Sequence, residues 1–71
     1  KRPLVRHPML SERETQVLRL LARGTKRRDI ARTLEINEKT VSTYKTRLLQ
    51  KLGLRNLVDL VRYAVDEHVA D

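Results

Sequence analysis

With 71 residues, 16 Lys and Arg against nine Asp and Glu, and a formal net charge of +7, the chain is long enough for one small domain and too short for two. It has no cysteine, which excludes a disulfide framework and a thiolate metal site, and it has no apolar run near the roughly 20 residues of a membrane span, so we expect a soluble, cytoplasmic protein. The positive charge points to a polyanionic partner, either nucleic acid or an anionic membrane surface, with a merely well-solvated basic surface as the alternative.

Residues 1–9 precede the first helical pattern and contain Pro3 and Pro8, three basic residues and no helical period. This composition predicts a linker or arm. We expect the chain to be a fragment cut within that linker, because its first residues are linker-like and lack an initiating methionine. The helical domain is expected over residues 10–69, with residues 70–71 as its C-terminal end.

The first helix is predicted over residues 12–23. Ser11 and Glu14 have the spacing of a capping box, in which each side chain bonds the backbone amide of the other residue. Val17, Leu18 and Leu21 recur at helical spacing. Gly24 supplies the left-handed residue that ends the helix.

The second helix is predicted over residues 26–34, with Thr25 as its N-cap. Its first turn carries three cations, Lys26, Arg27 and Arg28. Cations are disfavoured at a helix N-terminus because the helix dipole is already positive there. A bound phosphate would compensate for this cost; the alternative is that the solvent-screened cost is simply tolerated.

The third helix is predicted over residues 38–52 and ends at Gly53. Asn37 is a good N-cap, and Ile36 before it can pack on Val41 as a hydrophobic staple. Only residues 35–37 separate the second helix from the third. Two helices joined by so short a turn cross steeply, as in a helix-turn-helix.

The two sides of the third helix differ in character. An apolar side consists of Val41, Tyr44, Leu48 and Leu52. The opposite side has no acidic residue and consists of Lys39, Ser42, Thr43, Thr46 and Gln50, with Arg47 at its edge. Short hydroxyl side chains allow a helix to approach the floor of a groove and bond base edges, while cations at the margin reach phosphates. The alternative is an ordinary solvated face, but such a face usually mixes Glu with Lys.

The fourth helix is predicted over residues 57–69, with Asn56 as its N-cap. Its apolar arc covers nearly half of the circumference and consists of Leu57, Val58, Leu60, Val61, Ala64, Val65, His68 and Val69. The surplus edge formed by Val58, Val65 and Val69 is either a weak self-association surface or part of a small core that wraps this helix more fully.

Catalysis and metal binding find little support in the sequence. His7 and His68, the only histidines, stand at opposite ends of the chain without a metal-spaced partner. Ser11, Asp66 and His68 could be written as a triad, but the serine is explained as a cap and the helices offer no oxyanion hole. We therefore expect no enzyme, no metal and no cofactor.

From residue 10 to about residue 68 the chain resembles the C-terminal DNA-binding domain of LuxR/NarL/FixJ-type transcription regulators. The residues that carry the resemblance are 10–14, 17–18, 24, 29–31, 34, 39–42 and 48–53, and their spacing agrees with that of the family without a gap. The resemblance implies an all-α, four-helix fold in which a three-helix core contains the helix-turn-helix and a C-terminal helix makes the dimer contact. The third helix is then expected to enter the major groove of DNA.

The resemblance also implies roles for individual positions. The base-reading positions correspond to Lys39, Ser42, Thr43 and Thr46. The phosphate-contacting positions correspond to Lys26, Arg27, Thr40, Tyr44, Lys45 and Arg47. The dimer interface corresponds to Val58, Val61 and Val65. Glu14 is the family's first-helix glutamate, for which we expect a structural pairing with Arg47 or another basic residue of the third helix.

The function expected from the residues and the resemblance is sequence-specific binding of double-stranded DNA as a homodimer. Residues 39–45 and 47–49 are most similar to effector domains of bacterial two-component response regulators, in which a receiver domain controls pairing. The alternatives are a quorum-sensing or stand-alone LuxR-type regulator and a helix-turn-helix module that binds RNA polymerase or another regulator. Membrane binding is disfavoured because no helix has bulky apolar residues to spare from the core, and no small-molecule ligand is expected.

Overall fold

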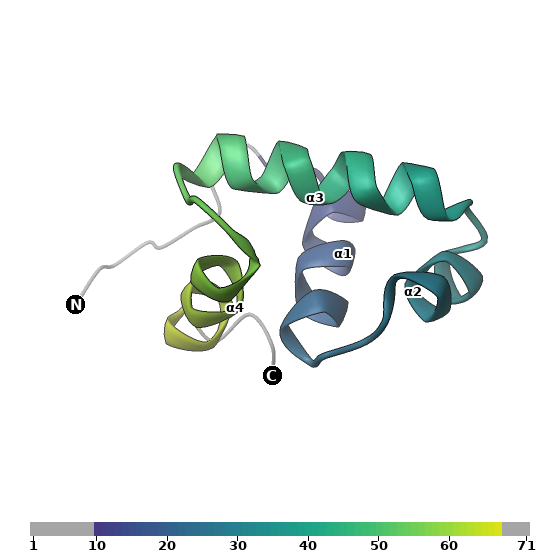
Figure 1. The fold of residues 1–71 in the computed structure, drawn as a ribbon, viewed down its shortest axis with the longest axis horizontal. Coiled ribbons are helices and arrows are strands. Elements are labelled where there is room, and N and C mark those ends of the chain that lie inside the picture. The colour runs from purple at the N-terminus through teal and green to yellow at the C-terminus, as the bar shows by residue number, and fades with distance from the viewer. Residues whose placement is uncertain (1–9, 68–71) are drawn as a thin grey trace.

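The structure, a computed structural model, describes residues 10–67 and consists of four helices in that range. These helices are α1 (Glu12–Ala22), α2 (Arg27–Leu34), α3 (Glu38–Leu52) and α4 (Leu57–Asp66). The described part of the chain has no strand, so the predicted all-α class is confirmed. The longest helix, α3, runs along one side of the domain, with α1 beneath its middle and α2 and α4 on either side of α1 (Figure 1).

The start of α1 is the predicted capping box. Ser11 Oγ accepts a hydrogen bond from the Glu14 amide at 3.0 Å, and Glu14 Oε1 accepts one from the Ser11 amide at 2.9 Å. The helix ends at Ala22, one residue earlier than predicted. The reason is that Arg23, with φ −86° and ψ 0°, has already left helical geometry to lead into Gly24 at φ +84°.

The prediction of Thr25 as the N-cap of α2 was wrong. Lys26 is the N-cap, so α2 begins at Arg27, and the Lys26 side chain makes no capping hydrogen bond. The Thr25 amide takes part in the end of α1, where it donates a hydrogen bond to Leu20 O at 3.1 Å. Together with the bond from the Gly24 amide to Leu21 O at 3.0 Å, this completes a Schellman motif.

The end of α2 uses the same motif without a glycine. The Ile36 amide bonds Ala31 O at 2.9 Å and the Glu35 amide bonds Arg32 O at 3.3 Å. Glu35 takes the left-handed conformation at φ 58°, which carries a steric cost for a residue with a Cβ atom. The left-handed conformation of Glu35 could not be predicted from its residue type, because glycine is the usual residue at this position of the motif.

The other two helices begin as predicted. Asn37 Oδ1 accepts from the Thr40 amide at 2.8 Å, and Asn56 Oδ1 accepts from the Asp59 amide at 2.9 Å. The bounds of α3 match the prediction, with Gly53 left-handed at φ 68°. The predicted extension of α4 to residue 69 was wrong, because α4 ends at Asp66, where the following residue, at φ −95° and ψ 8°, leaves the helix. Residues 68 and 69 lie outside the described range.

The core consists of two adjoining clusters. The larger one joins α1, α3 and α4 and contains Val17, Leu18, Leu48, Leu60 and Ala64. The smaller one joins α2 to the start of α3 and contains Ile30, Ala31 and Val41, with Ile36 packed against it as the staple requires. The half-buried Leu21 and Leu34 pack against both clusters. The predicted apolar side of α3 therefore faces the interior.

Candidate nucleic-acid interface

The outer side of α3 lies on the surface of the domain. Lys39, Thr43, Thr46, Arg47 and Gln50 are exposed, and none of them belongs to either core cluster. Ser42 is half-buried, because it faces the start of α2. The turn of residues 35–37 gives α2 and α3 different directions (Figure 1). A continuous polar surface thus runs along the second helix of a helix-turn-helix.

Two hydroxyls near the start of α3 form local hydrogen bonds. Thr40 Oγ1 donates to Asn37 Oδ1 at 3.0 Å, and Thr43 Oγ1 donates to the Lys39 carbonyl oxygen at 3.2 Å. In the absence of a ligand, each bond favours one rotamer of its threonine side chain. Preorganised side chains lose less conformational entropy when they bind.

A contact between α2 and α3 was not foreseen from the sequence. Arg27 Nε lies 3.3 Å from Glu38 Oε1, and Arg27 Nη1 donates to Ser42 Oγ at 3.3 Å. The two charged side chains remain 60% and 49% exposed, so this ion pair contributes little to stability. It does bring an expected phosphate contact, Arg27, directly against an expected base-reading residue, Ser42. The only signal in the sequence was an acid in the first turn of the third helix.

The expected phosphate-contacting side chains differ in exposure. Lys26, Arg27 and Arg47 are exposed, and Thr40, Tyr44 and Lys45 are half-buried. Tyr44 packs against the larger core cluster, so its ring is anchored in the domain. Lys45 and Arg27 line a hollow of about 130 Å³ together with Leu21, Val41, Ser42 and Leu57. Two cations therefore border one concave region beside the outer side of α3.

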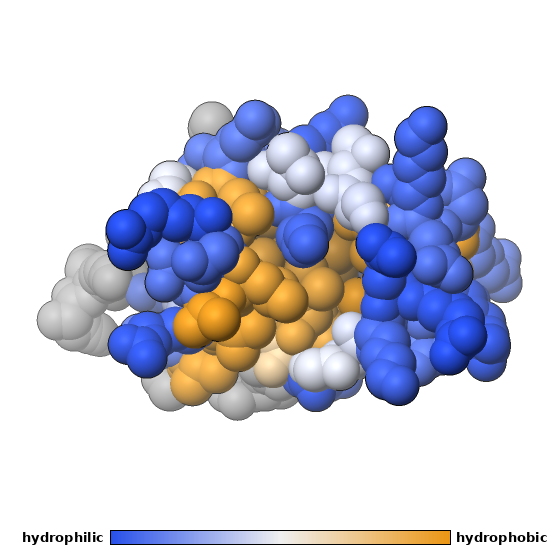
Figure 2. Space-filling view, viewed as in Figure 1, coloured by the Kyte–Doolittle hydropathy of each residue, from blue (hydrophilic) through white to orange (hydrophobic). Residues whose placement is uncertain are grey.

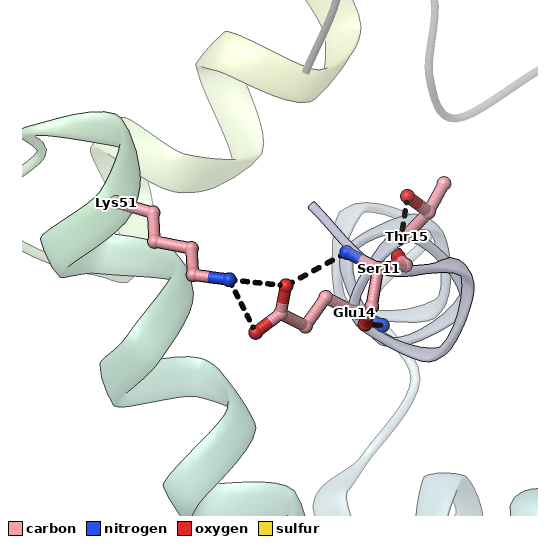
Figure 3. Close-up of polar contacts among 4 residues, drawn as sticks. All are labelled: Ser11, Glu14, Thr15 and Lys51. Carbon is pink, nitrogen blue, oxygen red and sulfur yellow. Dashed lines mark hydrogen bonds and ion pairs between the residues drawn. The ribbon is translucent and has the colours of Figure 1, made fainter. Parts of the chain in front are cut away.

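Glu14 ties the start of α1 to the last turn of α3 (Figure 3). Its carboxylate accepts two hydrogen bonds from Lys51 Nζ, at 2.8 and 3.1 Å. The pairing with a basic residue of the third helix is thus present, through Lys51 rather than Arg47, which stays exposed. The Lys51 ammonium and the Ser11 amide lower the pKa of Glu14 below its ordinary value, against the opposite effect of its burial.

The surplus apolar edge of α4 is not covered by the described part of the chain. Val58 is 68% exposed and Val65 is 55% exposed. With Val61, they line a shallow groove of about 570 Å³ that Leu57, Arg62 and Asp66 complete. Figure 2 shows an apolar area over α4 that continues toward the middle of the domain, bordered by hydrophilic side chains over α2.

Residues 10–67 contain neither a candidate metal-binding cluster nor a candidate membrane span. No group of three or more acidic or histidine side chains in this range could hold a metal ion, and no helix in it is long and apolar enough to cross a membrane. The two histidines lie outside the described residues. The Ser11 hydroxyl is engaged as the cap of α1.

Four helices, a short turn between the second and third, and an exposed polar side on the third define a DNA-binding helix-turn-helix domain. The family described as bacterial regulatory proteins, luxR family, matches residues 8–64. The chain belongs to this family, which confirms the resemblance noted in the sequence. The family is one of DNA-binding transcription regulators.

Curated relatives match most of this chain. It is 52% identical over 62 residues to BvgA of Bordetella pertussis, a protein named as a transcription regulator of virulence factors. It is 40% identical over 63 residues to the oxygen regulatory protein NreC of Staphylococcus carnosus, and 46% identical over 55 residues to the fimbriae Z protein of Salmonella typhimurium.

These matches cover 87%, 89% and 78% of this chain. They cover 30%, 29% and 26% of the relatives, so the chain spans about three tenths of their length. No solved structure matches the chain at a significant level.

Proposed function

We propose that this chain binds double-stranded DNA in a sequence-specific manner, with α3 in the major groove, as the effector domain of a bacterial two-component response regulator. The observation that carries the proposal is that the outer side of α3 is exposed, hydroxyl-bearing and flanked by cations. An α-helix fits the major groove of B-DNA, and short side chains let its backbone come close to the base edges.

Binding affinity is assigned mainly to the phosphate contacts, from Lys26, Arg27, Thr40, Tyr44, Lys45 and Arg47. Of these, Thr40 donates to a phosphate only when its hydroxyl gives up the bond to Asn37 Oδ1. Each phosphate neutralised by Lys26, Arg27, Lys45 or Arg47 releases counterions, so the affinity falls steeply as the salt concentration rises. Lys45 and Arg27 border the same hollow beside α3, which favours their acting on one segment of backbone. Discrimination between sequences is assigned to Lys39, Ser42, Thr43 and Thr46, which carry the donors, acceptors and methyl groups that base edges require.

Useful specificity requires two copies, because one domain of this size covers only a few base pairs. We place the homodimer contact on Val58, Val61 and Val65 of α4. This assignment is supported by the exposure of Val58 and Val65 and by the groove that they line. An isologous contact through α4 would place two α3 helices on adjacent half-sites.

The proposal extends to the whole regulator that this domain would serve. Relatives about three times as long are named as a transcription regulator of virulence factors and as an oxygen regulatory protein. We infer that a receiver domain, switched by aspartate phosphorylation, controls the pairing of two effector domains. The location is then the cytoplasm, where bacterial DNA is accessible.

The test is a selection of random duplex oligonucleotides with the purified 71-residue chain. Recovery of a repeated half-site is expected, and its repeat geometry will define the arrangement of the dimer. Thr46→Ala should lower the ratio of specific to non-specific affinity with little change in salt dependence. Lys45→Ala should weaken binding to every duplex and reduce the slope of log affinity against log salt by about one.

Arg62→Ala is the matched control, because it removes an exposed cation from α4 rather than from the α2–α3 surface. It should leave the affinity of one chain for one half-site nearly unchanged. Binding without any sequence preference, or a preference that Thr46→Ala and Thr43→Ala both leave intact, would show that α3 is not the reading element.

A further inference from the structure

The hydroxyls on the outer side of α3 differ in what they can offer a base. A hydroxyl has one proton to donate and two lone pairs that accept. Thr43 uses its proton within the helix, in the bond from Oγ1 to the Lys39 carbonyl oxygen at 3.2 Å. While this bond holds, Thr43 presents lone pairs and a methyl group to the exterior, so it acts as an acceptor.

The Ser42 hydroxyl accepts a hydrogen bond within the domain, whereas the Thr43 hydroxyl donates one. Ser42 Oγ accepts a hydrogen bond from Arg27 Nη1 at 3.3 Å, which is the one side-chain hydrogen bond that it makes among residues 10–67. One lone pair is therefore occupied and the hydroxyl proton is not used inside the described domain. A charged donor on the oxygen also polarises the O–H bond, since hydrogen bonds in a chain strengthen one another.

Glu38 holds the guanidinium that produces this arrangement. Its Oε1 lies 3.3 Å from Arg27 Nε, on the neighbouring edge of the same planar group. Arginine has five N–H donors in a fixed fork, and these two bonds use two of them. The remaining three leave Arg27, whose side chain is 60% exposed, able to reach a phosphate at the same time.

We propose that Arg27 and Glu38 are positioning residues that make Ser42 a hydrogen-bond donor to DNA, while Thr43 reads as an acceptor. In the major groove, guanine N7 and O6, adenine N7 and thymine O4 accept, whereas cytosine presents only its amino group. Ser42 therefore selects guanine, adenine or thymine and rejects cytosine at its base. Thr43 selects the amino group of cytosine or adenine, or the thymine methyl group. This inference rests on the proposed DNA binding.

The test uses the 71-residue chain and the duplex recovered by the selection described above. The base read by Ser42 is the position at which Ser42→Ala lowers discrimination, by about three- to tenfold for one hydrogen bond. Arg27→Met and Glu38→Ala should each lower discrimination at that same position. In a Ser42→Ala background they should lower it no further, because the hydroxyl that they orient is gone.

Two further measurements separate positioning from a structural role. Glu38→Ala should raise affinity for random duplex DNA, because it removes an acidic side chain beside the phosphates, while Arg27→Met should lower it. If the selected base is a purine read at N7, its 7-deaza analogue should weaken binding of the unaltered chain and leave Ser42→Ala unaffected. Thermal unfolding of each variant reports any loss of folded protein.

Thr43→Val is the matched control, because valine keeps the shape and a methyl group but has no acceptor. Its effect on base preference should be independent of Arg27 and Glu38. Selection of cytosine at the Ser42 position, an unchanged preference in Ser42→Ala, or equal effects of Arg27→Met with and without Ser42 would each overturn the inference while DNA binding stands. Loss of all sequence preference in the unaltered chain would instead overturn the proposed function.

Discussion

Replacing Glu14 by glutamine tests whether the partly buried ion pair between α1 and α3 holds the domain together. Glu14 is 3% exposed and accepts three hydrogen bonds, one from the Ser11 amide and two from Lys51 Nζ. Glutamine preserves the acceptor for the Ser11 amide. Its NH₂ group, however, confronts the ammonium of Lys51 with a second donor, and the negative charge is lost.

The expected cost lies between two limits. Loss of a hydrogen bond to a charged group costs about 1.5–3 kcal/mol, and removal of one partner from a fully buried pair costs about 3–5 kcal/mol. The Lys51 side chain is 34% exposed, so water can solvate its ammonium when the carboxylate is lost. We therefore expect Glu14→Gln to lower the free energy of unfolding by about 2 kcal/mol. For a domain of this size, that corresponds to a fall in Tm of about 8–16 °C.

Urea and thermal unfolding, followed by circular dichroism at pH 7, measure this change. The matched control is Glu38→Gln, the same substitution in the exposed pair with Arg27, for which we expect less than about 0.5 kcal/mol. Lys51→Met should cost at least as much as Glu14→Gln, because it leaves the buried carboxylate without its cation. Equal small effects at positions 14 and 38 would refute the reasoning.

The same pair makes stability depend on pH in acid. The pKa of Glu14 is lowered in the folded protein, chiefly by Lys51, so the folded state binds this proton less readily than the unfolded chain. Its stabilisation is complete above the unfolded glutamate pKa of about 4.3 and is lost as the pH falls through the lowered folded pKa. The difference in unfolding free energy between the unaltered chain and Glu14→Gln should therefore shrink below about pH 4.

Three other substitutions test separate features. Glu35→Gly should raise stability by up to about 1 kcal/mol, because it relieves the left-handed conformation at φ 58°; a loss of stability in urea unfolding would argue against strain there. Gly53→Ala should lower stability by about 1 kcal/mol, since φ is +68° and no atom lies within 4 Å of the added Cβ; a much larger loss would mean that packing, not backbone conformation, governs the site. Val58→Asp should abolish cooperative binding to paired half-sites and change unfolding by less than about 0.5 kcal/mol, because Val58 is 68% exposed; mobility-shift assays on one and two half-sites provide the readout.

Features set by neighbouring residues in the chain were predictable from the sequence. The caps at Ser11, Asn37 and Asn56 depend on a side-chain oxygen and an amide three residues later, so their spacing is sufficient. Thr25 had an equally good side chain, but α2 begins one residue later, with Lys26 as its N-cap. Where the backbone turns into the helix depends on the geometry of the connection from α1, which residue type alone does not specify.

For contacts between two crossing helices, the type of partner could be predicted from the sequence, but not the particular residue. A basic partner on the third helix was expected for Glu14, but the relative positions of α1 and α3 decide that it is Lys51. The contact of Arg27 with Glu38 and Ser42 crosses the turn between α2 and α3, and periodicity within one helix carries no information about it. The same holds for the exposed edge of α4, where only packing distinguishes Val58 and Val65 from core residues.

The division of the core gives the domain unequal local stability. Among the described helices α2 contacts α1 and α3 but not α4, and its own cluster contributes three buried side chains, Ile30, Ala31 and Val41. Opening of α2 should therefore cost less free energy than global unfolding, so its amides should exchange with deuterium faster than those at the centres of α1 and α3. The segment that carries Arg27 is thus the one whose protection against exchange should rise most when a duplex is bound.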